Sequence, residues 1–383
     1  MALLPLFLVF CCITIIMTPS SASLTPADFR AMAARAAAGE PFTPAEIQST
    51  LQSFENAAPP RCNVDYCKLQ GFLQRVAHVS FKQNYDDTAR NAQELSALLG
   101  SPDDEGFCGM FKRVLEGGNY YCARDFAAAA GKEGKPWAVL VTGLNGIRKT
   151  TTINSPFFGD ILGEALAGSG NTAASASLPT GGNSFFRQLD YMIATLANDQ
   201  FQSLYAVADV GEYAACKNAI FARYRNLAEV LGVLLIQHCK QRRMNVLVET
   251  SGRDISSFDY MDSNFPSDIY SKMVVHFTID DISYAERSVD TRMLREMADG
   301  RACIGESHLD ATRLIAVNQG GPYGSSQLRA VQADSDRVLA SVLGGSAGRA
   351  DWCKARVAVE PSASEAWVVR AAGSAVAYTF ERR

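Results

Sequence analysis

The sequence predicts an α/β protein, in which a parallel sheet is flanked by helices, with a helical amino-terminal region and a small carboxyl-terminal extension. Three observations lead to this fold class. Residues 23–134 show mostly helical periodicity. Residues 135–300 alternate apolar strand-like runs with helical segments, which is typical of parallel sheets. Residues 301–383 contain two late strand-like runs, 355–359 and 366–369, which would complete or cap the sheet.

The composition is that of a globular protein. Of the 383 residues, 48% are hydrophobic and 20% are charged, so the chain can build a packed core. The net charge of −4 argues against a protein that coats DNA or RNA, and no nucleic-acid partner is expected. The sequence contains no repeat of fixed period, which excludes solenoids and propellers.

The first 22 residues resemble a signal peptide. Leu3–Met17 is an apolar run of 15 residues interrupted only by Pro5 and Thr14. This run is short for a membrane span, and small residues lead up to Ala22. We expect cleavage after residue 22, a secretory or extracellular location, and no stable membrane span afterwards. No Lys or Arg precedes the apolar run, so a retained anchor or a misassigned start remain alternatives.

The cysteine count also fits a secretory context. Ten cysteines are present, and eight remain once the first 22 residues are set aside. An even number permits disulfides, and four of the eight fall within 62–122. We expect two disulfides among Cys62, Cys67, Cys108 and Cys122, and reduced thiols at Cys216, Cys239, Cys303 and Cys353. Zinc binding is disfavoured because Cys62 and Cys67 have no second paired motif.

Region 23–134 is expected to be helical and without catalytic residues. Thr43 and Glu46 form a capping-box pattern at the start of one helix. The helices expected here are Thr25–Ala38, Thr43–Phe54 and Thr88–Leu99.

A strand–loop–helix pattern begins the next region. The buried-type strand Trp137–Val141 leads into the glycine-containing loop 142–152, and helical spacing follows at Ile161–Ala167. Successive backbone amides in such a loop bind phosphate; Lys149 would reach the β- and γ-phosphates, and the Thr150 hydroxyl would bind Mg²⁺. The expected nucleotide-binding residues are Gly143, Leu144, Asn145, Gly146, Ile147, Arg148, Lys149, Thr150 and Thr151.

The loop resembles a Walker A motif with one departure. The motif has glycine directly before its lysine, whereas this chain has Arg148 there and Gly146 two positions earlier. Arg148 either crowds the loop or supplies a second phosphate contact through its guanidinium group.

A second constellation follows the strand Asn245–Glu249. Its last residue, Glu249, would face the mouth of the loop, where it could hold Mg²⁺ through water or act as a general base. Arg253 follows a small-residue turn and could bind a substrate phosphate or another anion. The alternative is a solvated glutamate and a helix-capping arginine.

A third constellation is the strand Lys272–Asp280 and the helix Tyr284–Met297 after it. Arginines that close over a γ-phosphate stabilise the transferred charge, and Arg287 and Arg292 are the candidates. They point about 140° apart on an ideal helix, so both would face one site only if the helix bends like a lid. Ion pairs along a solvated helix surface are the alternative.

The segment between the loop and these strands carries further candidates. A loop is expected at Gly168–Gly182 and helices at Asn183–Asn198 and Glu212–Gln241, with Asp190 and Arg187 exposed. Asp209 is a second carboxylate candidate for Mg²⁺ or for a general base. The long helix also carries basic residues that could face a phosphate, although such helix faces are usually solvated: Lys217, Arg223 and Arg225.

Taken in order, these pieces resemble the P-loop kinases, in the branch that includes zeta-toxin-like and small-molecule kinases. The resemblance rests on GLNGIRKT, VLVETSGR, VVHFTIDD and the arginine-bearing helix, and the turn Glu249–Arg253 is similar to the Glu-x-Thr-x-Arg turn of zeta-toxin-like proteins. It implies a P-loop kinase-like fold with a five-stranded parallel sheet. It also implies ATP with Mg²⁺ as cofactors, and transfer of the γ-phosphoryl group to a small hydroxyl-bearing acceptor.

The same resemblance implies roles for individual residues. Lys149 and Thr150 would bind the nucleotide and Mg²⁺, Arg287 or Arg292 would supply the lid contact, and Glu249 and Arg253 would lie near the acceptor. Either Asp209 or Glu249 would orient the acceptor hydroxyl. The alternative function is a secreted or lumenal protein whose degenerate loop binds a nucleotide or another anion without catalysis. Hydrolase triads and zinc enzymes are disfavoured because the histidines are scattered, and His276 is expected in the core.

Overall fold

The structure is a computed structural model that describes residues 23–60, 62–79, 84–131, 134–168, 178–304, 317, 320–344, 349–361 and 366–380. The expected signal peptide over 1–22 and most of the expected loop at 168–182 lie outside these residues. Within the described part of the chain, no helix is both long and apolar enough to cross a membrane.

A single seven-stranded sheet forms the centre of the molecule. Its order is β2-β3-β1-β4-β5-β6-β7, in which the first five strands are parallel and the last two antiparallel. The strands are β1 (Trp137–Thr142), β2 (Ser184–Arg187), β3 (Asn245–Glu249), β4 (Ser271–Ile279), β5 (Cys353–Pro361), β6 (Trp367–Ala371) and β7 (Tyr378–Phe380). The predicted α/β class, a parallel sheet flanked by helices, is confirmed.

Strand order places a ligand crevice next to β1. The chain leaves β1 toward β2 on one side, whereas it leaves β4 toward β5 on the opposite side. Neighbouring strands whose connections diverge in this way leave a crevice at their carboxyl ends, and ligands of open α/β sheets bind there. The loop after β1 therefore lies at the position where this topology favours a binding site.

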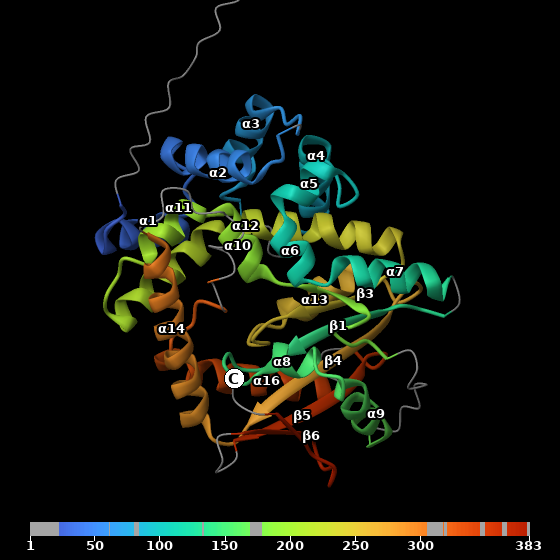
Figure 1. Ribbon diagram of the computed structural model, residues 1–383. Coiled ribbons are helices and arrows are strands. Elements are labelled where there is room, and N and C mark those ends of the chain that lie inside the picture. Colours follow the sequence, from blue (N-terminus) through green and yellow to red (C-terminus); the bar gives the residue numbers. More distant parts are fainter. Residues whose placement is uncertain are drawn as a thin grey trace, which may run out of the picture.

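The amino-terminal region is helical, as its periodicity indicated. Capping boxes at Thr25 and Thr43 begin its first two helices. The helices are α1 (Pro26–Ala38), α2 (Pro44–Ala57), α3 (Tyr66–Val76), α4 (Tyr85–Leu99), α5 (Glu105–Met110), α6 (Lys112–Gly117) and α7 (Tyr120–Ala130). Figure 1 shows most of them above the long helix α12 (Val210–Gln241), with the sheet below it. The buried ion pair between Arg223 on α12 and Glu46 on α2 ties these layers together at 2.8 Å.

The remaining helices pack around the sheet and α12. They are α8 (Lys149–Ile153), α9 (Phe158–Gly168), α10 (Leu189–Leu196), α11 (Asn198–Leu204), α13 (Ser256–Asn264), α14 (Ile282–Ile304) and α16 (Leu328–Leu343), with a 3₁₀ turn at Ser325–Gln327. The helix expected over Asn183–Asn198 is wrong at its start, because β2 occupies its first residues. The boundary expected at 300/301 falls inside α14, and the carboxyl-terminal segment extends the sheet.

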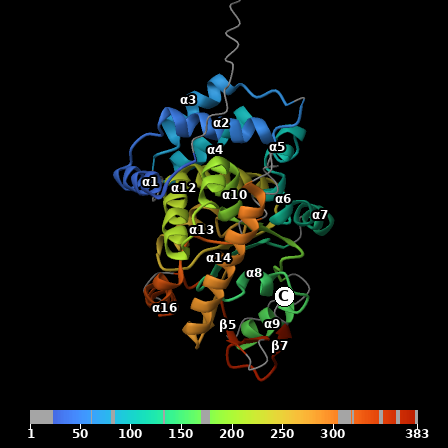
Figure 2. The same ribbon diagram turned by 60° about the vertical axis from the view of Figure 1, so that its left-hand side comes forward.

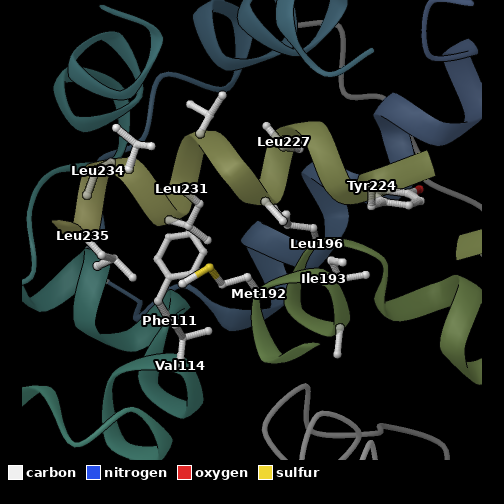
Figure 3. Packing of buried hydrophobic residues seen from close by; sticks show 14 of the residues in the cluster. Phe111, Val114, Met192, Ile193, Leu196, Tyr224, Leu227, Leu231, Leu234 and Leu235 are labelled. Carbon is white, nitrogen blue, oxygen red and sulfur yellow. The ribbon is translucent and has the colours of Figure 1, made fainter. Parts of the chain in front are cut away.

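Both faces of the sheet are buried. Ala138 and Leu140 of β1 join the core that includes the amino-terminal helices and α12, whereas Val139 and Val141 join a second core with α9, α14 and β5. Because side chains alternate along a strand, burial on both faces explains the continuous apolar run in β1. Figure 3 shows the first core, where Leu231 of α12 packs beside aromatic and aliphatic side chains.

The disulfide prediction is wrong within the described residues. Cys62, Cys67, Cys108 and Cys122 are free thiols. Cys62 and Cys108 are partly buried, and the other two are exposed. The fold buries large apolar cores on both sides of the sheet and does not depend on cross-links between these helices.

Candidate functional site

The loop between β1 and α8 is shaped by two glycines. Gly143 has φ +127°, and a Cβ there would lie 2.4 Å from the carbonyl oxygen of Phe277. Gly146 has φ +82°, and a Cβ there would lie 2.7 Å from Cγ2 of Val289 on α14. No other residue type fits either position without displacing its neighbours, so these glycines let β4 and α14 pack directly against the loop.

Arg148 occupies the position where the Walker motif has its second glycine. It adopts the left-handed conformation, with φ +62°, which costs a non-glycine residue about 1–2 kcal/mol. Its guanidinium carbon lies 5.2 Å from the ring centroid of Trp367 on β6, within cation–π distance. The side chain therefore stacks on a core aromatic residue, and this contact offsets part of the backbone cost.

Lys149, Thr150 and Glu249 meet at the carboxyl edge of the sheet. Lys149 is 4% exposed, and its Nζ donates hydrogen bonds to the carbonyl oxygens of Gly143 (3.0 Å) and Leu144 (2.6 Å). The same Nζ lies 3.1 Å from Oε1 of Glu249, while the Thr150 hydroxyl donates to Oε2 of Glu249 at 3.1 Å. The parallel register of β1 and β3, which aligns Val141 with Glu249, brings these groups together.

A cavity of about 780 Å³ opens over this edge. Its wall includes the loop after β1, the ends of β2 and β3, and residues of α12, α13 and α14, with Tyr85 and Thr88 contributed by the amino-terminal helix α4. Within the described part of the chain, four carboxylates and seven cations line it. The carboxylates are Asp190, Glu229, Glu249 and Asp254, and the cations are Arg148, Lys149, Arg187, Arg225, Arg253, Arg292 and Arg295. The excess of cations suits an anionic ligand.

Three of these arginines are available to such a ligand. Among the described residues, Arg253, Arg292 and Arg295 form no ion pair with a carboxylate, whereas Arg187 and Arg225 pair with Glu229. The guanidinium carbon of Arg253 lies 4.9 Å from the ring centroid of Tyr323. Nη2 of Arg292 donates to the carbonyl oxygen of Gly321 at 3.5 Å, a weak contact that a phosphate oxygen could replace.

Asp190, at the start of α10, lies in the cavity wall. A Cβ on Gly321 would lie 2.9 Å from Nδ2 of Asn145 in the loop and 3.9 Å from Oδ2 of Asp190, so loop and carboxylate flank the same residue. Burial raises the pKa of Asp190 to about 6, and the negative charge of Glu249 adds to the rise, while Lys217 and Arg292 oppose it. The sequence predicted Asp190 and Arg187 to be exposed on a helix, but Arg187 is buried on β2, and Asp190 lies in the cavity wall. The role of Asp190 was missed because β2, the strand that leads to it, is too short for a periodic signal.

The structure separates the other predicted residues. Arg292 faces the cavity, but Arg287 is exposed and lies 3.9 Å from Asp281. Asp209 lies outside the cavity lining, where its carboxylate caps α12 by accepting a hydrogen bond from the backbone amide of Glu212 at 2.8 Å. This position favours a helix-capping role for Asp209 over the Mg²⁺ or general-base role that the sequence suggested.

The basic residues of α12 lie in two different environments. Lys217 and Arg223 are buried and pair with Glu296 and Glu46, whereas Arg225 lines the cavity. His276 is buried as expected, with its Nδ1 2.8 Å from the Thr142 hydroxyl, and burial lowers its pKa to about 4.

Thr150 and Glu249 are suitable ligands for Mg²⁺. The cation prefers oxygen ligands and keeps several waters when it binds beside phosphates, so one hydroxyl and one carboxylate suffice. Their oxygens approach within 3.1 Å, at the edge of the sheet beside Lys149. No cluster of three or more His, Cys, Asp or Glu side chains that could hold a metal occurs among the described residues, so a dedicated protein-only metal site is absent from that part of the chain.

Comparisons with known proteins give a distant structural likeness. A chain from the PezAT chromosomal toxin-antitoxin system of Streptococcus pneumoniae is similar over 64% of this chain and 78% of its own length, with 12% sequence identity and a TM-score of 0.32. No family model matches the sequence, and no curated protein matches it. At this level of similarity, the evidence on function comes from the chemistry of the cavity itself.

Proposed function

We propose that the protein is an ATP-dependent phosphotransferase that acts on a small hydroxyl-bearing acceptor. The observation that carries the proposal is the meeting of Lys149 and Thr150 of a glycine loop with Glu249 of β3, at the edge of a cavity. Three arginines in the cavity wall form no ion pair with a carboxylate of the described residues: Arg253, Arg292 and Arg295. Phosphoryl transfer depends on positioning and on charge neutralisation, and this cavity supplies both.

The nucleotide belongs on the β1 side of the cavity. Its phosphates would accept hydrogen bonds from the loop amides, and Lys149 would exchange the carbonyl oxygens of Gly143 and Leu144 for phosphate oxygens. Thr150 and Glu249 would hold a Mg²⁺ ion, whose chemistry there is to neutralise charge on the β- and γ-phosphates.

The acceptor belongs over β3 and β2. Adjacent strands lie about 4.8 Å apart, so the end of β2 is about 10 Å from the loop after β1, which leaves room for a phosphoryl group and an acceptor between them. Asp190, which follows β2, would accept the hydroxyl proton while the acceptor oxygen bonds to the γ-phosphorus. The bond between that phosphorus and the bridging oxygen of ADP then breaks.

Arg292 would face the transferred group. It lines the cavity, and the phosphoryl oxygens could replace its contact with Gly321. Because charge spreads over those oxygens in the transition state, a fixed guanidinium group there lowers the barrier.

The test is calorimetric titration of the purified protein with a non-hydrolysable ATP analogue and Mg²⁺, alongside an assay of ADP formation. We expect micromolar, Mg²⁺-dependent binding that Lys149→Ala removes, because that lysine is the cation inside the loop. Asp209→Asn is the matched control, since asparagine caps a helix as well as aspartate does. Binding that is unchanged in Lys149→Ala would refute the nucleotide site.

The second candidate function is a protein that binds a nucleotide or another anion without catalysis. One observation favours it: Lys149 is already held by two carbonyl oxygens and by Glu249, so a ligand has to compete for it. Analogue binding without ADP formation, under every acceptor condition tried, would favour this alternative over the phosphotransferase.

A further inference from the structure

A fully buried ion pair lies between α12 and α14. Nζ of Lys217 is 2.8 Å from Oε1 and 2.9 Å from Oε2 of Glu296, and both side chains have no exposed surface. The hydroxyl of Tyr213 also donates to Oε1 of Glu296, at 2.5 Å. The carboxylate is therefore well satisfied by donors from one helix.

The pair is linked to the proposed catalytic group Arg292 through α14. Glu296 follows Arg292 by one helical turn, so the two side chains leave α14 about 40° apart and share a face of the helix. Charged groups on three elements act on the pKa of Asp190: Lys217 on α12 and Arg292 on α14 lower it, whereas Glu249 on β3 and Glu296 on α14 raise it. Of these, Lys217 acts most strongly, and it favours the ionised carboxylate.

Helix α14 also touches the phosphate loop. The hydroxyl of Ser288 donates to the carbonyl oxygen of Gly146 at 3.0 Å, and Nη2 of Arg301 donates to the carbonyl oxygen of Val207 at 3.0 Å. Arg292 therefore lies on α14 between two fixed points: Ser288, which contacts the loop, and Glu296, which pairs with Lys217 of α12. Figure 2 shows α14 running past α12 toward the lower strands.

Packing alone does not require charges at this position. Replacing a buried ion pair by apolar side chains of similar volume is often neutral or stabilising, whereas removing one partner costs about 3–5 kcal/mol. A fully buried Lys–Glu pair beside two cavity-lining charges is therefore better explained by an electrostatic role than by cohesion between the helices.

We infer that Lys217 and Glu296 are positioning residues of the proposed phosphotransferase: their buried ion pair fixes the turn of α14 that carries Arg292, and the charge of Lys217 acts on the carboxyl group of Asp190. The inference rests on the proposed function. Neither residue touches the nucleotide or the acceptor; they act through Arg292 and Asp190.

The experiment compares Lys217→Met/Glu296→Met with a matched control, Arg223→Met/Glu46→Met. The control removes another buried ion pair of α12, one that lies outside the cavity lining. Mg²⁺-ATP with water as acceptor is the probe, and ADP formation is measured from pH 5 to pH 9. Thermal denaturation and titration with the ATP analogue are run on the same samples.

We expect the first double variant to fold and to bind the analogue with unchanged affinity. We also expect its kcat to fall about 10- to 100-fold, and the acidic limb of its pH profile to move to higher pH. The control is expected to lose stability and to keep its kcat. Wild-type kcat and an unshifted profile in the first double variant would overturn the inference. If that variant does not fold, Glu296→Gln, which keeps the side-chain shape, is measured instead. Its kcat is expected to fall and its acidic limb to move to lower pH, because the charge of Glu296 raises the pKa of Asp190. Wild-type kcat with an unshifted profile in Glu296→Gln would overturn the inference.

A different result would refute the proposed function itself. If the wild-type protein forms no ADP under any acceptor condition, the phosphotransferase proposal fails. The electrostatic effect of Lys217 on Asp190 is then measured through protein stability instead of turnover. The effect of Asp190→Asn on the melting temperature at pH 8 is measured in the wild-type background and in Lys217→Met/Glu296→Met. A larger effect in the double variant supports the link, because Lys217 no longer favours the carboxylate; an equal or smaller effect overturns it.

Discussion

Replacing Asp190 by asparagine should stabilise the protein at alkaline pH and remove its activity. The pKa of Asp190 is raised from 3.8 to about 6 by burial and by Glu249. A carboxyl group whose pKa is higher in the folded state destabilises the fold wherever both states are ionised. That cost is absent below about pH 4, grows as the pH rises to about 6, and is constant above it. Asparagine keeps the shape of the side chain and removes the charge.

The size of the effect follows from the shift. A difference of about two pKa units, at about 1.4 kcal/mol per unit, gives about 3 kcal/mol, and relaxation of the folded protein reduces this to about 1–3 kcal/mol. For a chain of this length each kcal/mol moves the melting temperature by about 2 °C. The expected gain is therefore about 2–6 °C at pH 8 and much less at pH 4.5. Loss of a general base should lower kcat about 10²- to 10⁴-fold.

Differential scanning calorimetry at pH 4.5 and pH 8, together with an ADP-formation assay, measures both effects. Asp209→Asn is the control, because that carboxylate is exposed and caps a helix that asparagine caps as well. A melting temperature for Asp190→Asn at pH 8 that is equal to or below that of the wild-type protein would contradict the stability argument. Unchanged turnover would remove Asp190 from the mechanism.

Three further predictions test the site and the fold. Arg292→Ala should lower kcat about 10²- to 10³-fold, whereas Arg287→Ala, a change at an exposed side chain, should leave kcat unchanged. Equal effects of the two changes in a turnover assay would refute a specific role for Arg292. Arg148→Gly should be more stable than Arg148→Ala by about 1 kcal/mol in urea denaturation, because only alanine keeps the left-handed strain; equal midpoints would refute this reason. Iodoacetamide should label Cys67 and Cys122 in the native protein but Cys239 only after unfolding, since that thiol is buried and its pKa is raised; a peptide map showing Cys67 disulfide-bonded would refute the free-thiol structure.

The sheet and the phosphate loop could be predicted because their signals are local. A continuous apolar run marks β1, glycines at 143 and 146 mark the turn, and Glu249 ends the strand that pairs with β1. These features depend on residues that are close together along the chain, which the hydrophobic pattern and the glycine positions reveal.

The rest of the cavity could not be predicted because it depends on tertiary packing. Tyr85 reaches the site from an amino-terminal helix that looked unrelated to function. The choice of Arg292 over Arg287 depends on which face of α14 packs against the loop and α12, and both arginines fit the sequence pattern. Asp190 was hidden because a four-residue strand gives no period that distinguishes it from a helix.

The two carboxylates of the site differ in environment, and this difference assigns their roles. Glu249 contacts a lysine ammonium and a threonine hydroxyl at the phosphate loop, so it belongs to the nucleotide side. Asp190 is held two strands away, where burial raises its pKa toward neutrality. A base works best when its pKa lies near the working pH, and the oxygens of Glu249 are already engaged by Lys149 and Thr150. In the proposed phosphotransferase, the acceptor proton would therefore go to Asp190, and Glu249, for which the resemblance implied a role near the acceptor, would act at the nucleotide instead.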